Sequence, residues 1–296
     1  MINSAAFIRA GDAVTLATFN SSNIPADSIT TEVTFRQNNQ DRSRNFGAYK
    51  AYPFLGTRVI RIEGDILGTS YTDYKDKRLA IMSIADPQPG ISASVSSPYY
   101  LGLLSLDVDG TTMVTWVTLD GYPELPIDVG MGPTNGRYMI AFKSIDPYLY
   151  SSTIHTQINI TKNTSYTPVN LGNGYCRNMT FRINGPQTIG AGDAAITVIM
   201  DQPATPDRAT LTFSARMLTS DYIDVDVLNR RLLFFENATG LTTQFNNYTM
   251  SNWDEWYLHP TGYTLGGLSD AIFWNTTATD ATPGKMQISW QDAYLI

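Results

Sequence analysis

The sequence is poor in cysteine, histidine and charged residues. Its 296 residues include one cysteine and two histidines, and only 16% of them are charged, below the roughly 25% usual for soluble domains. A single cysteine excludes an intrachain disulfide framework and a zinc site built from several cysteines. Twenty lysines and arginines against 27 acids give a net charge of −7, which disfavours binding to the phosphate backbone of nucleic acids.

The sequence also has no recognisable targeting or membrane segment. Residues 1–6 contain no positive stretch followed by an apolar one, so we expect no secretory signal there. No apolar run reaches 18 residues, so we expect no membrane span. These features indicate a protein that is made in a cytoplasm and kept there or packaged from it.

Motifs for catalysis or metal binding are missing as well. There is no Gly-x-Ser-x-Gly, no His-Glu-x-x-His and no EF-hand pattern, and His155 and His259 lie far apart in the chain. Cys176 matches no nucleophile motif, and we expect a small buried residue there. The sequence therefore predicts no catalytic residues, no cofactor and no metal site.

Apolar and polar residues alternate along most of the chain, which predicts β-strands. The clearest hairpin has Leu104 and Leu106 on one face, a turn at Asp109-Gly110, and Val114 and Trp116 on the return strand. Further alternating runs lie near residues 60–62, 138–142, 179–183, 211–217, 223–227 and 288–290. Strands at this density, separated by turn residues, indicate a sandwich or a barrel.

One segment has helical periodicity instead. Leu79 and Met82 lie three residues apart, Thr72 or Asp73 can cap the start, and Asp86-Pro87 ends the pattern. We predict a short helix at about residues 72–85 that closes an open end of a β-sandwich.

The chain divides naturally near residue 150, where a polar connector follows Asp146-Pro147. We predict an all-β protein with one short helix and two β-sandwich domains, residues 1–150 and 151–296.

Residues 36–56 lack clean alternation and are too polar for a core. They contain Arg42 and Arg44, followed by Tyr49 and Tyr52. Two interpretations are open: a solvated loop, or a projecting arm that grips a neighbouring subunit.

Aromatic residues gather around two acids late in the chain. Trp253, Trp256 and Tyr257 flank Asp254 and Glu255. Adjacent strand residues point to opposite faces, which argues against a glycosidase site built from these two carboxylates. Aromatic rings also bind sugars by stacking, so a carbohydrate-binding β-sandwich that uses Trp253, Trp256 and Tyr257 is an alternative function.

Several segments follow one another in a recognisable order. They are residues 58–68, 73–81, 141–151, 221–235, 251–262 and 288–296. The first two read as a strand, a turn and a short helix, and residues 141–151 read as an aromatic strand followed by Asp-Pro and Tyr. Their order and spacing resemble the distal tail protein family of long non-contractile-tailed bacteriophages, over most of the chain from about residue 30.

The resemblance implies a structural protein of the phage tail tip rather than an enzyme. Members form a hexameric ring between the tail tube and the tail hub or adhesion device, with a lumen that lets DNA pass. An acidic chain suits that role because it does not hold the passing duplex. The family's first β-sandwich carries a helix and an arm that embraces the adjacent subunit, and the second is galectin-like (jelly-roll) and faces outward.

The resemblance also implies partners and a location. The partners are further copies of the chain, the tail tube protein, the hub or tail-associated protein, and receptor-binding or side-fibre proteins. The location is the virion tail tip, after synthesis in the cytoplasm of a bacterial host. The family's arm matches residues 36–56, which makes Arg42, Arg44, Tyr49 and Tyr52 candidate subunit-interface residues. Another tail tube or hub component with the same β-domains remains an alternative.

Overall fold

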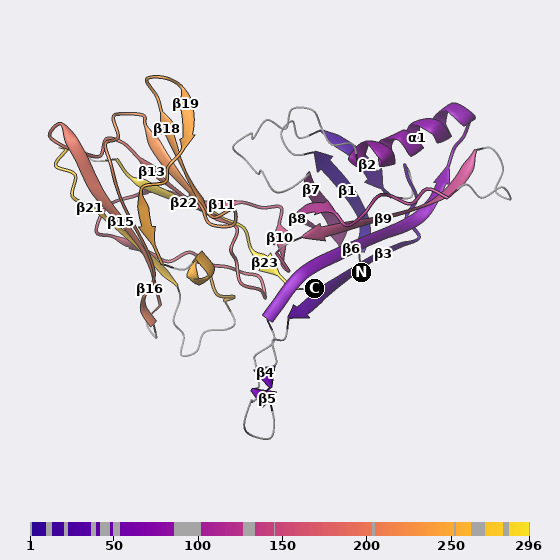
Figure 1. Ribbon diagram of the computed structural model, residues 1–296, viewed down its shortest axis with the longest axis horizontal. Helices are drawn as coiled ribbons and strands as arrows, with labels where there is room; N and C mark the ends of the chain where they lie inside the picture. Colours follow the sequence, from indigo (N-terminus) through magenta and orange to yellow (C-terminus); the bar gives the residue numbers. More distant parts are fainter. Residues whose placement is uncertain are drawn as a thin grey trace. The chain divides into compact units, whose positions relative to one another are not determined.

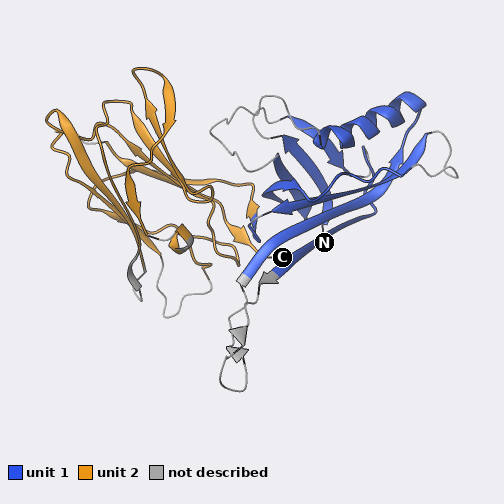
Figure 2. Ribbon diagram, in the orientation of Figure 1, with its two compact units in different colours: residues 1–149 blue, residues 150–296 orange. Residues whose placement is uncertain are grey.

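The structure is a computed structural model, and it describes most of the chain. The described residues are 2–9, 14–20, 23–36, 40–41, 48–49, 54–85, 102–126, 134–144, 146–202, 205–251, 253–261, 270–280 and 284–295. The chain divides into two compact units, unit 1 (residues 1–149) and unit 2 (residues 150–296), coloured separately in Figure 2. The division lies next to the boundary predicted from the sequence.

Unit 1 is an antiparallel sheet with one helix (Figure 1). Its elements are β1 (Ile2–Arg9), β2 (Thr15–Phe19), β3 (Ser28–Arg36), β6 (Phe54–Leu67), α1 (Tyr71–Ile84), β7 (Gly102–Val108), β8 (Thr111–Leu119) and β9 (Asn135–Ser144). The strand order is β2-β1-β7-β8-β9-β6-β3. The short strands β4 (Gln40–Asp41) and β5 (Ala48–Tyr49) pair with each other between β3 and β6 in the chain.

The sheet of unit 1 folds over so that its two ends form opposing layers. Phe7 on β1 stacks on Phe142 of β9 with ring centroids 5.5 Å apart, and Phe19 on β2 stacks on Tyr138 of β9 at 5.6 Å. The Tyr138 hydroxyl donates to the Pro25 carbonyl oxygen at 2.9 Å, and burial raises the pKa of this tyrosine. Aromatic stacking therefore joins the two layers within a core that is otherwise mostly aliphatic.

The predicted hairpin is present as β7 and β8. Asp109 and Gly110 have positive φ angles of 50° and 83°, as a two-residue type I′ turn requires. This tight turn sets Leu106 opposite Met113 and Leu104 opposite Thr115. The core face of β8 is therefore Met113, Thr115 and Val117, and Val114 and Trp116 lie on this strand as predicted, on its other face.

The predicted helix is also present, with a different cap and a different buried face. Ser70, rather than Thr72 or Asp73, is the N-cap, and its hydroxyl accepts from the Asp73 amide at 3.1 Å. Ile81 and Ile84 are buried, whereas Leu79 and Met82 are about half exposed, at 51% and 49%. The helix carries two apolar stripes, and the stripe that packs against β2 and β6 is not the predicted one.

The remaining strands follow along the chain, and the unit boundary falls within the first of them. They are β10 (Leu149–Ser151), β11 (His155–Ile160), β12 (Ser165–Tyr166), β13 (Met179–Asn184), β14 (Thr188–Ile189), β15 (Gly192–Gln202), β16 (Thr205–Ala215), β17 (Tyr222–Asp226), β18 (Arg231–Glu236), β19 (Leu241–Gln244), β20 (Tyr248–Met250), β21 (Ala271–Thr276), β22 (Met286–Trp290) and β23 (Ala293–Tyr294), with a 3₁₀ helix, η2 (Trp253–Glu255).

Unit 2 is a sandwich of two antiparallel sheets (Figure 2). One has the order β11-β22-β13-β17-β18-β19, and the other has the order β12-β21-β15-β16-β20 with β14 beside β15. The alternating runs predicted for β13, β17 and β22 bury the predicted faces, for example Phe181 and Val225. The buried Trp274 on β21 links the sheets, because its Nε1 donates to the Ile160 carbonyl oxygen of β11 at 3.1 Å.

The described residues are almost entirely strand and turn, with a single α-helix among them. The predicted fold class, all-β with one short helix, is therefore confirmed. The galectin-like character of unit 2 stays a prediction.

Candidate assembly surfaces and polar anchor

The predicted arm falls mostly outside the described residues. Arg42, Arg44 and Tyr52 lie outside them, and of Tyr49 the structure describes only the backbone, in β5. The backbone there forms a short antiparallel pair, Gln40 opposite Tyr49 and Asp41 opposite Ala48. The role of these four residues as subunit contacts stays a prediction.

The predicted aromatic cluster separates into core and surface residues. Trp256 is fully buried, edge-on to Phe181 at 5.5 Å, and a buried ring offers no face to a sugar. Trp253 lies in η2 and is half-buried, edge-on to Tyr248 at 6.4 Å. Tyr257 is also half-buried, so sugar stacking by Trp253 and Tyr257 stays a prediction.

Tyr257 belongs to a cluster that the sequence did not reveal. Its ring centroid lies 5.0 Å from those of both Tyr175 and His259, and Tyr175 lies 5.5 Å from His259. His259 Nδ1 lies 3.0 Å from an Asp270 carboxylate oxygen, and Asp270 is buried. The Asp270 carboxylate fixes the imidazole, which in turn orients the two tyrosine rings.

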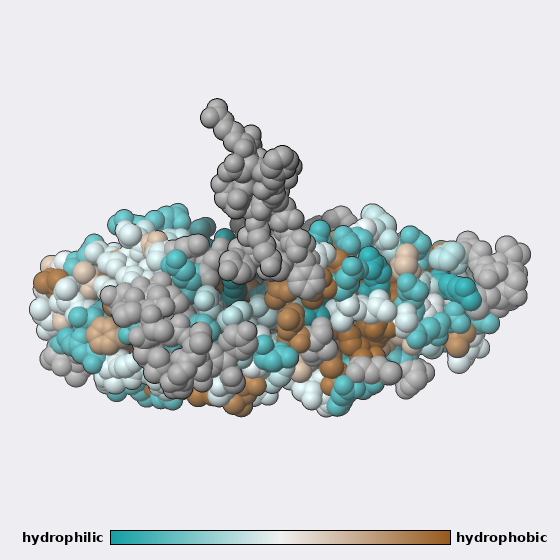
Figure 3. All heavy atoms as spheres, turned by 90° about the horizontal axis from the view of Figure 1, so that it is seen from below, coloured by the Kyte–Doolittle hydropathy of each residue, from teal (hydrophilic) through white to brown (hydrophobic). Residues whose placement is uncertain are grey.

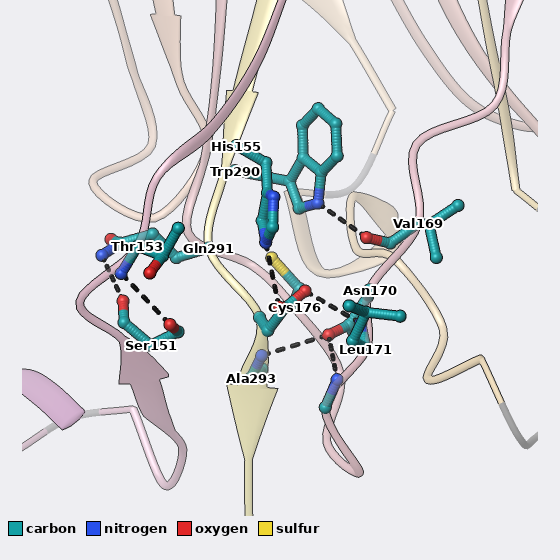
Figure 4. Close-up of polar contacts among 12 residues, drawn as sticks. Ser151, Thr153, His155, Val169, Asn170, Leu171, Cys176, Trp290, Gln291 and Ala293 are labelled. Carbon is teal, nitrogen blue, oxygen red and sulfur yellow. Dashed lines mark hydrogen bonds and ion pairs between the residues drawn. The ribbon is translucent and has the colours of Figure 1, made fainter. Parts of the chain in front are cut away.

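A second buried carboxylate joins the beginning of unit 2 to its end (Figure 4). Asp292 Oδ2 lies 2.9 Å from His155 Nε2, and the Asp292 carbonyl oxygen accepts from the Ser151 amide at 2.9 Å. Gln291 Nε2 donates to the Ser151 carbonyl oxygen at 2.6 Å. Together with Asn170, these residues form what we call the polar anchor: Ser151, His155, Asn170, Gln291 and Asp292.

Asn170 uses all of its side-chain hydrogen-bonding capacity on backbone groups. Its Nδ2 donates to the carbonyl oxygens of Gly174 (2.7 Å) and Leu258 (3.3 Å). Its Oδ1 accepts from the amides of Gly172 and Ala293, both at 3.1 Å. A side chain at Gly172 would overlap the Ala293 carbonyl oxygen, so this loop must pass close to the last strand.

Unit 1 buries a charge rather than an amide. Arg58 on β6 is fully buried, and its Nε and Nη1 donate at 2.7 Å to the Pro147 carbonyl oxygen and to Thr31 Oγ1. Desolvation lowers the pKa of the Arg58 guanidinium from its ordinary value to about 10, and the charge of Asp146 opposes that shift. The arginine thus fixes the Asp146-Pro147 turn to the sheet.

The outer face of the β13-β17-β18 sheet carries an ordered row of side chains. Arg182 makes two 2.7 Å hydrogen bonds to the Asp224 carboxylate, and these bonds raise the pKa of Arg182. Its guanidinium lies 4.0 Å from the Tyr222 ring centroid. Tyr222 stacks on Phe235 at 4.7 Å, which continues the row across β18.

On the face seen in Figure 3, hydrophilic residues are interspersed with groups of hydrophobic residues among the described atoms. Within the described ranges, no three His, Cys, Asp or Glu side chains gather where they could hold a metal ion. No helix in the described part of the chain is long and apolar enough to cross a membrane. Cys176 is fully buried, as predicted.

The polar anchor has no signature in the sequence, because its contacts join residues that are far apart in the chain. His155 and Asp292 are 137 positions apart, and Leu171, whose amide donates to Asp292 Oδ1, is 121 positions from it. Isolated Asn, Asp and His residues in loops carry no local pattern, so the sequence had no signal for this network.

The whole chain aligns with a solved phage protein. The Dit protein (gp 19.1) of phage SPP1, described as a paradigm of the hub adsorption apparatus of phages that infect Gram-positive bacteria, aligns over 98% of this chain and 99% of its own length. The TM-score is 0.56 and the sequence identity is 12%. The chain has the fold of the SPP1 Dit protein. The resemblance to distal tail proteins is thereby confirmed at the level of the fold.

Two chains of the phage p2 baseplate in its activated conformation also align. The baseplate solved with Sr gives a TM-score of 0.47 over 98% of both chains, and the one solved with Ca gives 0.45 over 99% of this chain and 98% of that one. Sequence identity is 10% in both. No protein-family model matches the sequence, and no curated protein matches it.

Proposed function

We propose that this protein is a structural component of a phage tail tip. The observation that carries the proposal is the alignment with the SPP1 Dit protein over almost the full length of both chains. The alignment includes both units, so the two proteins share the order of two β-sandwiches rather than one common domain. In the tail hub, such a chain of two β-sandwiches acts by assembling with other proteins rather than by catalysis.

The buried polar groups also support a structural role. Three buried side chains form hydrogen bonds with backbone groups and neighbouring side chains: Asn170, Asp292 and Arg58. Each of them holds a turn or a chain end in place, which is a structural task. Catalytic groups, in contrast, need to reach a substrate.

The proposed mechanism is geometric. Six copies close a ring because one surface of each copy binds a different surface of the next at a fixed rotation. The ring joins the tail tube to the hub or adhesion device, and DNA passes through its lumen. The net charge of −7 favours passage without retention of the duplex. Receptor-binding or side-fibre proteins dock on the outside.

The mass of the purified protein in solution tests the ring. We expect light scattering behind a sizing column to give about six times 32.7 kDa, and electron microscopy to show rings with an open centre. A protein that stays monomeric alone and in the presence of its tail tube protein would contradict the proposal.

The arm is tested by replacing Arg42, Arg44, Tyr49 and Tyr52 together with alanine. We expect the ring to dissociate while the thermal unfolding of the monomer stays unchanged, because interface side chains of these types contribute to binding rather than to the fold. An intact ring in this variant would remove the arm from the interface.

Carbohydrate binding by unit 2 is a second candidate function. The Tyr175–Tyr257–His259 cluster favours it, because Tyr175 is 36% exposed and its ring is held by the two others. Tyr175→Ala and Tyr257→Ala should then each abolish binding on a glycan array. Tyr122→Ala, which removes an exposed tyrosine of unit 1, is the matched control.

A further inference from the structure

Asn173 and Gly174 form an Asn-Gly pair in the chain between β12 and β13. Asn173 is exposed, yet both polar atoms of its side chain bond to the backbone of one residue. Its Nδ2 donates to the Leu295 carbonyl oxygen at 3.1 Å, and its Oδ1 accepts from the Leu295 amide at 2.7 Å. The Gly174 amide donates to the Ala293 carbonyl oxygen at 2.9 Å. All three contacts therefore come from β23 and the residue that follows it.

An Asn-Gly pair can lose its side-chain amide by deamidation, because glycine has no side chain to hinder attack by its own nitrogen. The glycine nitrogen bonds to Cγ of the asparagine and gives up its proton. The bond between Cγ and Nδ2 breaks, and ammonia leaves with that proton. Water then opens the cyclic imide at one of its two carbonyl groups, which gives aspartate or isoaspartate. The reaction needs only water as a co-reactant.

The contacts with β23 block this reaction in the folded chain. The bond to Ala293 engages the attacking nitrogen of Gly174, and the two bonds to Leu295 keep the Asn173 amide from turning toward that nitrogen. The loop lies directly against β23, because a side chain at Gly172 would overlap the Ala293 carbonyl oxygen. One short segment supplies all of these contacts, so its detachment removes them together.

The other two Asn-Gly pairs of the chain are held differently. Asn135-Gly136 lies inside the ten-residue strand β9, which pairs with β6. In Asn184-Gly185, the glycine amide donates to the Asp221 carbonyl oxygen at 2.8 Å, and the asparagine Nδ2 donates to the Lys285 carbonyl oxygen at 2.9 Å. These two pairs are thus held by β6, by residues before β17 and by residues before β22.

β23 is a much smaller element than those that hold the other pairs. It has two residues and, among the described strands, pairs with β10. Local opening costs least where an element is short and makes few contacts. Asn173 is therefore the Asn-Gly asparagine that a local opening reaches first.

We propose that Asn173 is a deamidation site whose reaction is controlled by β23. Opening of β23 releases the Asn173 side chain and the Gly174 nitrogen, and closing protects them. The aspartate product has no Nδ2 donor, and it places a carboxylate oxygen against the Leu295 carbonyl oxygen. A buried or partly buried acceptor without a donor is unfavourable, so the product holds β23 less tightly than asparagine does. The change cannot reverse, because the ammonia is lost.

The unmodified full chain gives the first test. It is incubated at mildly alkaline pH, and mass spectrometry of its peptides follows all three Asn-Gly pairs in the same sample. We expect Asn173 to deamidate fastest. If Asn135 or Asn184 deamidates as fast as Asn173, the proposal is overturned.

A variant that weakens the contact with β23 tests the control of the reaction. Leu295→Pro removes the amide that donates to Asn173 Oδ1, and Leu295 is 38% exposed, so little packing is lost. Deamidation of Asn173 should become about two- to tenfold faster, the factor that corresponds to one lost hydrogen bond. The rates at Asn135 and Asn184 should not change, whereas general unfolding would raise all three.

Leu295→Ala is the matched control, because it shortens the same side chain and keeps the amide. It should leave the Asn173 rate close to that of the unmodified protein. Equal Asn173 rates in Leu295→Pro and Leu295→Ala would overturn control by β23.

The effect of the product is tested with Asn173→Asp. Hydrogen exchange of the full chain should be faster at the amides of Ala293 and Leu295 in this variant. Asn184→Asp, which makes the same change at another Asn-Gly pair, should leave exchange at these two amides unchanged. Equal exchange in both variants would show that the product does not loosen β23.

This inference does not rest on the tail-tip proposal. Deamidation of Asn173 takes place within one chain, so a monomer and a ring should both show it. A protein that forms no ring would still deamidate at Asn173 first, and a ring in which Asn173 does not react first would contradict only the deamidation site.

Discussion

Unit 1 closes its sheet with stacked aromatic rings and a helix, whereas unit 2 closes its sandwich with polar side chains that bond to backbone groups. In unit 1 the Phe7–Phe142 stack joins the layers, and α1 covers the β2 edge. In unit 2 Asn170 and Asp292 accept hydrogen bonds from the amides of Ala293 and Leu171. The difference teaches that the two units hold their layers and loops with different contacts, stacked rings in unit 1 and buried hydrogen bonds from side chains to backbone amides in unit 2.

The largest expected effect comes from removing one core aromatic residue in each unit. Phe142→Ala should destabilise unit 1, and Trp274→Ala unit 2, each by about 3–5 kcal/mol, because each leaves a large cavity. Calorimetry should show two unfolding transitions, and each variant should lower the midpoint temperature of only one of them. Tyr122→Ala, which removes an exposed ring, should move neither. A single transition that both variants lower equally would show that the units unfold together.

Introducing a charge at Asn170 should lower the free energy of unfolding more than shortening its side chain does. Asn170→Ala should cost about 1–3 kcal/mol, because it leaves buried amide and carbonyl groups without partners. Asn170→Asp should cost more, because a carboxylate oxygen would then face the carbonyl oxygens of Gly174 and Leu258. Denaturant unfolding of unit 2 measures both, and equal stability of Asn170→Asp and the unmodified protein would contradict the bonding pattern.

The buried arginine of unit 1 should resist even a conservative change. Arg58→Lys should cost about 1–2 kcal/mol, because an ammonium group cannot reproduce the two directed bonds to Pro147 and Thr31. Arg61→Lys is the matched control: Arg61 is exposed and lies 3.4 Å from Glu32, so its replacement should change stability by less than about 0.5 kcal/mol. Equal effects at both positions would argue against a structural role for Arg58.

The smallest expected effect is a pH dependence at the start of α1. The Thr69 amide and Lys77 hold the pKa of Asp73 below its usual value of about 3.9. A depressed carboxyl pKa stabilises the fold above the unfolded-state pKa, and this contribution is lost as the pH falls through the folded-state pKa. The stability difference between the unmodified protein and Asp73→Asn should therefore be present at pH 7 and vanish in acid.

Ser70→Ala is the control for that measurement. It removes a neutral N-cap, so its cost of about 1 kcal/mol should change little with pH. If the Asp73→Asn difference stayed constant down to pH 2, the carboxylate would not be the stabilising group.

The strands, the hairpin and the helix could be predicted from the sequence, because these elements depend on local periodicity. This periodicity did not determine which face is buried. On β8 the buried face follows from the turn, and on α1 both Leu79–Met82 and Ile81–Ile84 have helical spacing. A local pattern cannot choose between two such stripes, since the choice depends on the strands that the helix meets.

The candidate site was less predictable than the fold. Trp256 is adjacent to Tyr257 in sequence but lies in the core, because the chain after η2 turns one ring inward and leaves the other near the surface. The polar anchor joins residues on opposite sides of the unit 2 sequence, so only the folded topology brings them together.

The pairing of β10 with β23 has a further consequence for how this protein can change. The strand through which the chain enters unit 2 and the strand with which it finishes lie side by side, held by Ser151 and Asp292. A fold with adjacent ends tolerates circular permutation and insertion into a loop of another protein.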